Sequence, residues 1–74
     1  MRFFHSYETQ RDLVLKLLGL AAEPLYGLEM IERSAGVLRR GTVYIALGRM
    51  EREGLISSWR TGDGRRKYRL RNQM

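Results

Sequence analysis

The chain must fold around one small core without covalent help, because it has only 74 residues and contains no cysteine. A chain of this length buries about 60% of the surface that it exposes when unfolded, which suits one domain and not two. Without cysteine it has neither a disulfide nor a thiolate ligand for a metal. Its hydrophobic content of 43% favours a packed core over intrinsic disorder. We therefore expect a single domain held together by packing alone.

No segment of the sequence is suited to a membrane or to export. The longest apolar run, Leu17 to Ala22, is far shorter than the roughly 20 residues of a membrane span. The first residues, Met1 to His5, lack the apolar stretch of a signal peptide. The absence of cysteine suits the cytoplasm. We expect a cytoplasmic protein with no membrane partner.

Apolar residues at helical spacing predict the first two helices. Thr9 and Asp12 predict a helix start, and Pro24 requires that helix to end near Ala22. A second, short helix fits residues 26–34. Its expected inner face carries Leu28 and Ile31, and its expected stop is Gly36.

A third helix fits residues 41–53, and a β-hairpin follows it. The buried stripe of this helix consists of Val43, Leu47 and Met50, and Gly54 closes it. Residues 55–60 and 66–70 read as strands, joined by the turn residues 61–64. The sequence thus predicts an α+β fold, mostly α: three helices followed by a two-stranded wing, as in a winged helix-turn-helix. We assign residues 9–74 to this domain and residues 1–8 to an N-terminal extension.

The excess positive charge lies in the second half of the chain. Residues 1–38 hold four basic and five acidic residues, whereas residues 39–74 hold ten basic and three acidic residues. Such a field attracts polyanions, and a merely solvated surface would not require the segregation. Arginine, which makes up most of the basic residues, matches phosphate oxygens and guanine edges with its planar fork.

The third helix and the wing are the candidate DNA-binding elements. A helix N-terminus favours a phosphate, and a basic wing follows the backbone or enters the minor groove. We expect contacts to the DNA backbone from Arg39, Arg40, Thr42, Tyr44, Arg65, Arg66 and Lys67. We expect Arg49 to face bases, with Ile45 offering an apolar contact.

Other interpretations stay open for these elements. Arg49 and Arg52 could instead pair with Glu53 or Glu51 on a solvated helix. The charged wing could serve only to protect a sheet edge, and the aromatic residues Trp59 and Tyr68 could stack on single-stranded bases. The fold could also be a protein-interaction module without DNA readout. An enzyme is not expected, because the single histidine, His5, leaves no catalytic or metal-binding cluster, and we expect no cofactor.

Three stretches together resemble the PadR-type transcriptional regulators. Residues 17–31 resemble the family's leucine-rich helix and the Pro-Leu-x-Gly-Tyr-Glu-Ile segment that follows it. The others are Gly41-Thr42-Val43-Tyr44, followed by Glu51-x-x-Gly54-Leu55-Ile56, and the wing, Gly64 to Leu70. The resemblance runs from about Leu13 to Leu70. It implies a winged-helix repressor that binds an inverted-repeat operator as a dimer and releases DNA on meeting a small-molecule effector.

The sequence departs from the family at the loop before the third helix and at its end. Arg39-Arg40 stands where a serine or threonine followed by proline is common, and one residue is missing at Glu23-Pro24. The C-terminal helical region that usually dimerises is not present in these 74 residues. We therefore expect a homodimer formed through the N-terminal segment and an outer face of the first helix, with the interface residues Phe3, Phe4, Tyr7, Val14 and Leu18. The alternative is a monomer in which Phe3 and Phe4 fold back onto the core.

Overall fold

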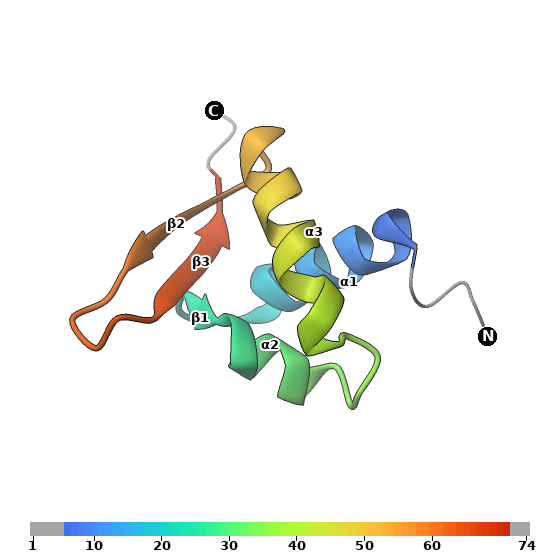
Figure 1. The fold of residues 1–74 in the computed structure, drawn as a ribbon, viewed down its shortest axis with the longest axis horizontal. Coiled ribbons are helices and arrows are strands. Elements are labelled where there is room, and N and C mark those ends of the chain that lie inside the picture. Colours follow the sequence, from blue (N-terminus) through green and yellow to red (C-terminus); the bar gives the residue numbers. More distant parts are fainter. Residues whose placement is uncertain (1–5, 72–74) are drawn as a thin grey trace.

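The computed structural model describes residues 6–71, and within them three helices and three strands form one unit (Figure 1). The helices are α1 (Tyr7–Leu20), α2 (Gly27–Arg33) and α3 (Arg40–Arg52). The strands are β1 (Leu25–Tyr26), β2 (Ile56–Arg60) and β3 (Arg66–Leu70). The predicted winged helix-turn-helix is confirmed, and the wing is the hairpin of β2 and β3.

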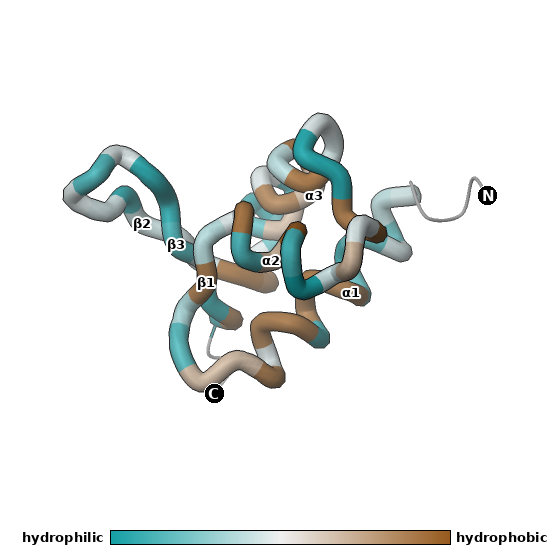
Figure 2. The backbone as a smooth tube through the Cα atoms, turned by 90° about the horizontal axis from the view of Figure 1, so that it is seen from below, coloured by the Kyte–Doolittle hydropathy of each residue, from teal (hydrophilic) through white to brown (hydrophobic). Residues whose placement is uncertain are grey.

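The core lies where the three helices meet the sheet. The predicted stripe on α3 is confirmed, because Val43, Leu47 and Met50 each have 0% exposure. Side chains from the other elements complete the core: Val14, Leu18, Leu25, Met30, Leu38, Ile56 and Tyr68. Figure 2 shows the consequence for the chain as a whole, with hydrophobic stretches along the helices and a largely hydrophilic wing that extends beyond them.

Helix α1 begins earlier than the sequence suggests and buries a different face. Its N-cap is Ser6, whose Oγ accepts the backbone N–H of Thr9 at 3.1 Å. The helix therefore starts within the segment that we assigned to an extension. The expectation that Val14 and Leu18 lie on an outer face is wrong. Together with Gln10 they repeat every four residues and form the buried stripe of α1 against α3 and β3.

Helix α2 is rotated relative to the expectation. Met30 is its fully buried side chain, whereas Leu28 is 38% exposed and Ile31 is half-buried, so the predicted inner face is wrong for Leu28. The chain leaves β1 and enters α2 without a loop, and this junction sets the rotation of the helix. Gly36 takes the expected left-handed conformation with a φ of +89°, but the left-handed residue that directly follows the C-cap Ser34 is Ala35, with a φ of +54°, so the helix stops before the predicted glycine.

The sheet has three strands rather than the expected two. Its order is β1-β3-β2, all antiparallel, with Leu25 opposite Tyr68 and Tyr26 opposite Lys67. A strand of two residues is too short to show alternation in a sequence, which is why β1 escapes periodicity analysis. Strand β1 nevertheless determines where α2 lies, because it attaches the start of α2 to strand β3 of the wing.

The wing follows α3 almost directly. Gly54 takes a φ of +80°, and the N–H of Leu55 donates to the carbonyl of Met50 at 3.0 Å, which ends the helix. Strand β2 starts at the next residue, so the hairpin stands beside α3 (Figure 1). The fold thus places a helix and a basic hairpin next to each other.

Candidate nucleic-acid interface

A cleft of about 370 Å³ separates the wing from the starts of α2 and α3. We call it the wing cleft. Its lining residues are Tyr26, Gly27, Leu28, Arg40, Tyr44, Gly64, Arg65, Arg66 and Tyr68. Three of them are arginines, and none of these described residues is acidic. The cleft therefore gathers cations from α3 and the wing, which are distant in sequence, around aromatic side chains.

Tyr44 occupies the α2 side of the wing cleft because Gly27 leaves room for it. A Cβ atom built on Gly27 would lie 2.7 Å from both Cε1 and Oη of Tyr44, well inside van der Waals contact. Gly27 itself is buried, while Tyr44 keeps 42% exposure. The glycine thus leaves room for the ring and its hydroxyl at the lining of the cleft, where a tyrosine hydroxyl can donate to a phosphate.

Gly27→Ala is expected to weaken duplex binding more than it weakens the fold. The added methyl group must displace the exposed ring of Tyr44, while helix α2 tolerates alanine well. Titration of a fluorescent duplex measures the affinity, and thermal unfolding measures the stability. The control is a double-mutant cycle: in a Tyr44→Ala background, Gly27→Ala should have no further effect on affinity. Additive losses would contradict the role of Gly27 as the seat of Tyr44.

The wing turn holds Arg65 in place. Its guanidinium pairs with the Asp63 carboxylate at 2.8 Å and lies 3.9 Å from the centre of the Tyr26 ring. Asp63 also accepts the backbone N–H of Arg65 at 3.1 Å and the hydroxyl of Thr61. The Thr61 hydroxyl and the Arg65 guanidinium hold the pKa of the Asp63 carboxyl far below its usual value. The predicted turn is therefore a local network that presents Arg65 at the mouth of the wing cleft.

Asp63→Asn is expected to tighten binding to non-sequence-specific duplex. The amide keeps an acceptor oxygen for the turn but removes the negative charge that pairs with Arg65. The slope of log K against log salt should steepen by up to about one unit. Asp12→Asn is the matched control, because Asp12 pairs with its neighbour Arg11 at 2.9 Å on α1, outside the wing cleft. Equal effects of the two substitutions would argue against a DNA contact by Arg65.

Arg66 is linked through a serine to α3. Its Nη1 donates to Ser58 Oγ at 2.9 Å, and Ser58 Oγ donates to the Glu51 carboxylate at 2.7 Å. Arg60 lies directly opposite Arg66 in the hairpin. Like charges in such a cross-strand pair repel, and a bound anion would relieve the repulsion. The arrangement thus fixes a guanidinium beside α3 and favours an anionic ligand.

The start of α3 offers backbone N–H groups to solvent. Its N-cap, Arg39, makes no side-chain capping hydrogen bond, and Arg39, Arg40 and Gly41 are all exposed. The hydroxyl of Thr42 donates back to the carbonyl of Arg39 at 3.4 Å. Ile45, one turn along, is 71% exposed. This end of the helix carries positive partial charge as well as two arginines.

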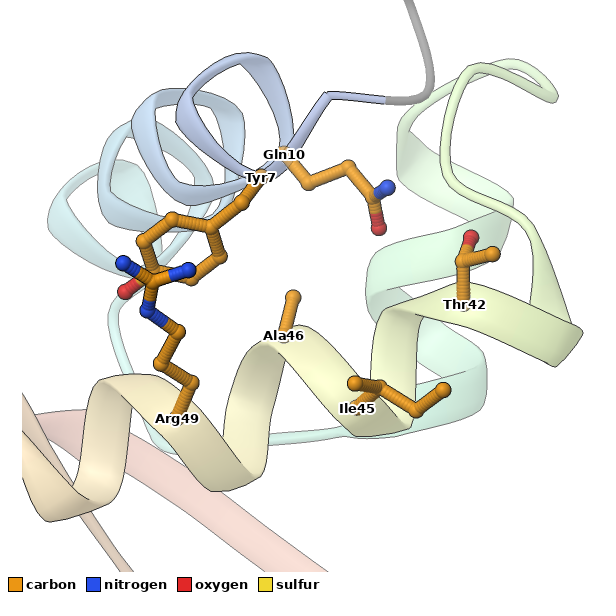
Figure 3. Close-up of a pocket in the computed structure, with 6 residues that line it drawn as sticks. All are labelled: Tyr7, Gln10, Thr42, Ile45, Ala46 and Arg49. Carbon is orange, nitrogen blue, oxygen red and sulfur yellow. The ribbon is translucent and has the colours of Figure 1, made fainter.

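Arg49 lies on the other side of α3, toward α1. Its guanidinium stacks 3.9 Å from the centre of the Tyr7 ring (Figure 3). Its Nε also pairs with the Glu53 carboxylate at 3.1 Å. The Tyr7 hydroxyl also donates to Glu53 at 2.5 Å. These hydrogen bonds, first from Tyr7 and then from Arg49, lower the pKa of Glu53. The pairing that the sequence left open for Arg49 is therefore present, while its expected base contact stays a prediction.

The predicted residues do not all meet in one place. The wing cleft unites Arg40, Tyr44, Arg65 and Arg66, whereas Thr42, Ile45 and Arg49 line a second cavity of about 190 Å³ between α3 and α1 (Figure 3). Lys67 lies 5.0 Å from the Tyr26 ring and lines neither cavity. Sequence reasoning missed the supporting residues Gly27, Ser58 and Glu51, since only their distant partners reveal their roles.

The residues predicted to form the dimer interface lie in different environments, and two of them lie outside the described residues. Val14 and Leu18 are 0% and 7% exposed and belong to the core of the same chain, so they are not available to a partner. Tyr7 packs on Arg49 of α3 and donates to Glu53, the C-cap of that helix, in the same chain. Phe3 and Phe4 lie outside the described residues.

Among residues 6–71, no helix has the length and apolar character needed to cross a membrane.

Comparison with known proteins identifies the family. No curated protein matches the chain. A profile of the Transcriptional regulator PadR-like family matches residues 14–73, which is most of the chain and includes α3 and the wing. With its three helices, basic wing and arginine-lined cleft, the chain belongs to the PadR-like family of DNA-binding transcriptional regulators.

Proposed function

We propose that the protein is a sequence-specific double-stranded DNA-binding repressor that acts on an inverted-repeat operator in the cytoplasm. Helix α3 lies in the major groove, and the phosphate backbone beside it enters the wing cleft. The observation that carries this proposal is the cleft itself, where Arg40, Arg65 and Arg66 converge with the exposed ring of Tyr44. No cofactor is part of the proposed function.

The proposed contacts divide into positioning and reading. Backbone contacts come from the start of α3 and from the wing, where the residues are Arg39, Arg40, Thr42, Tyr44, Arg65, Arg66 and Lys67. Ile45 faces the bases, since its side chain is the most exposed apolar one on α3. Contacts to phosphate set register and affinity, whereas contacts to base edges set sequence preference.

An inverted repeat requires two copies of the chain. Two recognition helices must lie about 34–36 Å apart to read successive half-sites. We propose that the segment before α1, with Phe3 and Phe4, joins the copies. Sedimentation of the intact chain and of a Phe3→Ser/Phe4→Ser variant tests this. A monomeric parent, or a variant as dimeric as the parent, would remove the proposal.

The salt dependence of duplex binding tests the proposed function. Each phosphate contact contributes about 0.9 to the slope of log K against log salt, so a cleft with several arginines should give a steep slope. Titrations at about 50 and about 200 mM salt cover the range in which the phosphate contacts change the affinity most clearly. Binding that ignores salt would sink the proposal and would favour a protein-docking role for the domain.

A further inference from the structure

The outermost strip of α3 is not where Arg49 lies. With Val43, Leu47 and Met50 buried, the 3.6-residue period places Gly41, Ile45, Gly48 and Arg52 on the opposite side. We call these four residues the outer strip. Tyr44 borders the strip on the wing side, and Thr42 and Arg49 border it on the α1 side, where they line the second cavity with Tyr7.

Arg52 folds back along the outer strip. A Cβ atom built on Gly48 would lie 3.7 Å from Nη1 of Arg52, so the guanidinium covers the backbone of Gly48. This direction is the ordinary one for a long helical side chain, which leans toward the N-terminus of its helix. The positive group therefore sits near the middle of the exposed face, and not at the end of the helix where Arg52 is attached.

The two arginines differ in how they are held. Arg49 is bound by the Glu53 carboxylate and by the Tyr7 ring, and this cluster joins α3 to α1. The side chain of Arg52 makes no hydrogen bond or ion pair within residues 6–71 and is exposed. A guanidinium without a carboxylate partner has all its donors available for a ligand.

We propose that Arg52 is the residue of α3 that reads a base edge, that Gly48 lets α3 approach the DNA closely, and that Arg49 braces α3 against α1. This inference rests on the proposed function, in which α3 enters the major groove. The guanidinium of Arg52 is suited to a bidentate contact with O6 and N7 of a guanine. Gly48, which has no side chain, lets the helix backbone approach the bases closely.

The position of Ile45 on α3 suggests a contact with a second base pair, next to the one that Arg52 reads. Gly48 follows Ile45 by three positions on α3, a rise of about 4.5 Å along the helix. Successive bases of one strand are about 3.4 Å apart, so the Ile45 side chain and the Arg52 guanidinium beside Gly48 reach neighbouring base pairs. An apolar side chain at this position selects the methyl group of thymine. The preferred half-site therefore contains a guanine next to an A·T pair whose thymine methyl faces Ile45.

Selection of bound duplexes from a random pool, followed by affinity measurements on the selected site, tests the assignment. The proteins are the full chain and its Arg52→Ala, Arg52→Lys and Arg49→Ala variants. Arg52→Ala should lose about 5- to 150-fold in affinity and should no longer distinguish the four bases at one G·C position. Arg52→Lys should keep charge but lose most of that preference, because an ammonium lacks the bidentate fork.

Arg49→Ala should weaken all sequences alike and lower the unfolding temperature. If Arg52→Ala keeps the base preference of the parent while Arg49→Ala loses it, the assignment is overturned although the proposed function stands. If the parent selects no sequence at all, the proposed sequence-specific function itself fails. The two failures are therefore distinguishable.

Gly48→Ala tests the close approach separately. Replacing a mid-helix glycine should raise the unfolding temperature by about 2–8 °C, since the new Cβ makes only an ordinary contact with Arg52. The same methyl group should lower affinity for the selected site. Gly19→Ala in α1 is the matched control, because its Cβ would lie 3.8 Å from Leu70. It should stabilise the fold without changing DNA binding, and an unchanged affinity for Gly48→Ala would overturn the close approach.

Discussion

Leu47→Ala is expected to lower the free energy of unfolding by about 2–5 kcal/mol. Leu47 has 0% exposure, and α3 packs against α1, α2 and β2 around it. The cavity left behind adds to the lost burial of the side chain. In a domain this small, each kcal/mol moves the unfolding midpoint by about 4–8 °C, so the midpoint should fall by about 10 °C or more.

Chemical and thermal unfolding, followed by circular dichroism, measure this effect. Ile45→Ala provides a control on the same helix, because Ile45 is 71% exposed and its truncation should change stability by less than about 0.5 kcal/mol. Equal losses for the two substitutions would mean that the described packing of α3 does not hold in solution.

The double substitution Arg40→Ala/Arg66→Ala is expected to reduce duplex affinity about a hundred-fold. These arginines enter the wing cleft from α3 and from β3, so one phosphate segment passes between them in the proposed complex. A hydrogen bond to a charged group contributes about 1.5 kcal/mol or more, and every 1.4 kcal/mol is a factor of ten. The slope of log K against log salt should decrease by about two units.

A charge-matched control separates the cleft from the net charge. Lys16→Ala/Arg33→Ala also removes two positive charges, but Lys16 on α1 and Arg33 at the end of α2 do not line the wing cleft. The control should retain most of the affinity. Similar losses for the two double variants would place the DNA elsewhere on the surface.

Much of the fold follows from local patterns. The stripe on α3 and the stop at Gly54 are confirmed, because apolar periodicity and a left-handed glycine depend on few neighbours. The strand 66–70 is confirmed to the residue. The charge of the second half likewise predicts a basic wing without knowledge of the tertiary structure.

The predictions that proved wrong concern features that depend on contacts between residues distant in sequence. Met30 rather than Leu28 is buried because β1 pairs with β3 and turns α2, and no property of residues 25–33 alone reveals that pairing. Val14 and Leu18 lie inward because the whole helix is rotated onto α3. Tyr7 and Arg49 are 42 positions apart in the sequence and meet only in the folded chain.

The pairing of β1 with β3 affects the order in which the domain folds during its synthesis on the ribosome. Leu25 and Tyr26 emerge early in synthesis, but their partners Lys67 and Tyr68 follow only after α2, α3 and β2 have been made. A nascent chain that stops before β3 has helices but no sheet, and its wing cleft lacks one wall. Assembly of the DNA-facing surface therefore follows the synthesis of α2, α3 and β2, because the non-local pairing of β1 waits for β3.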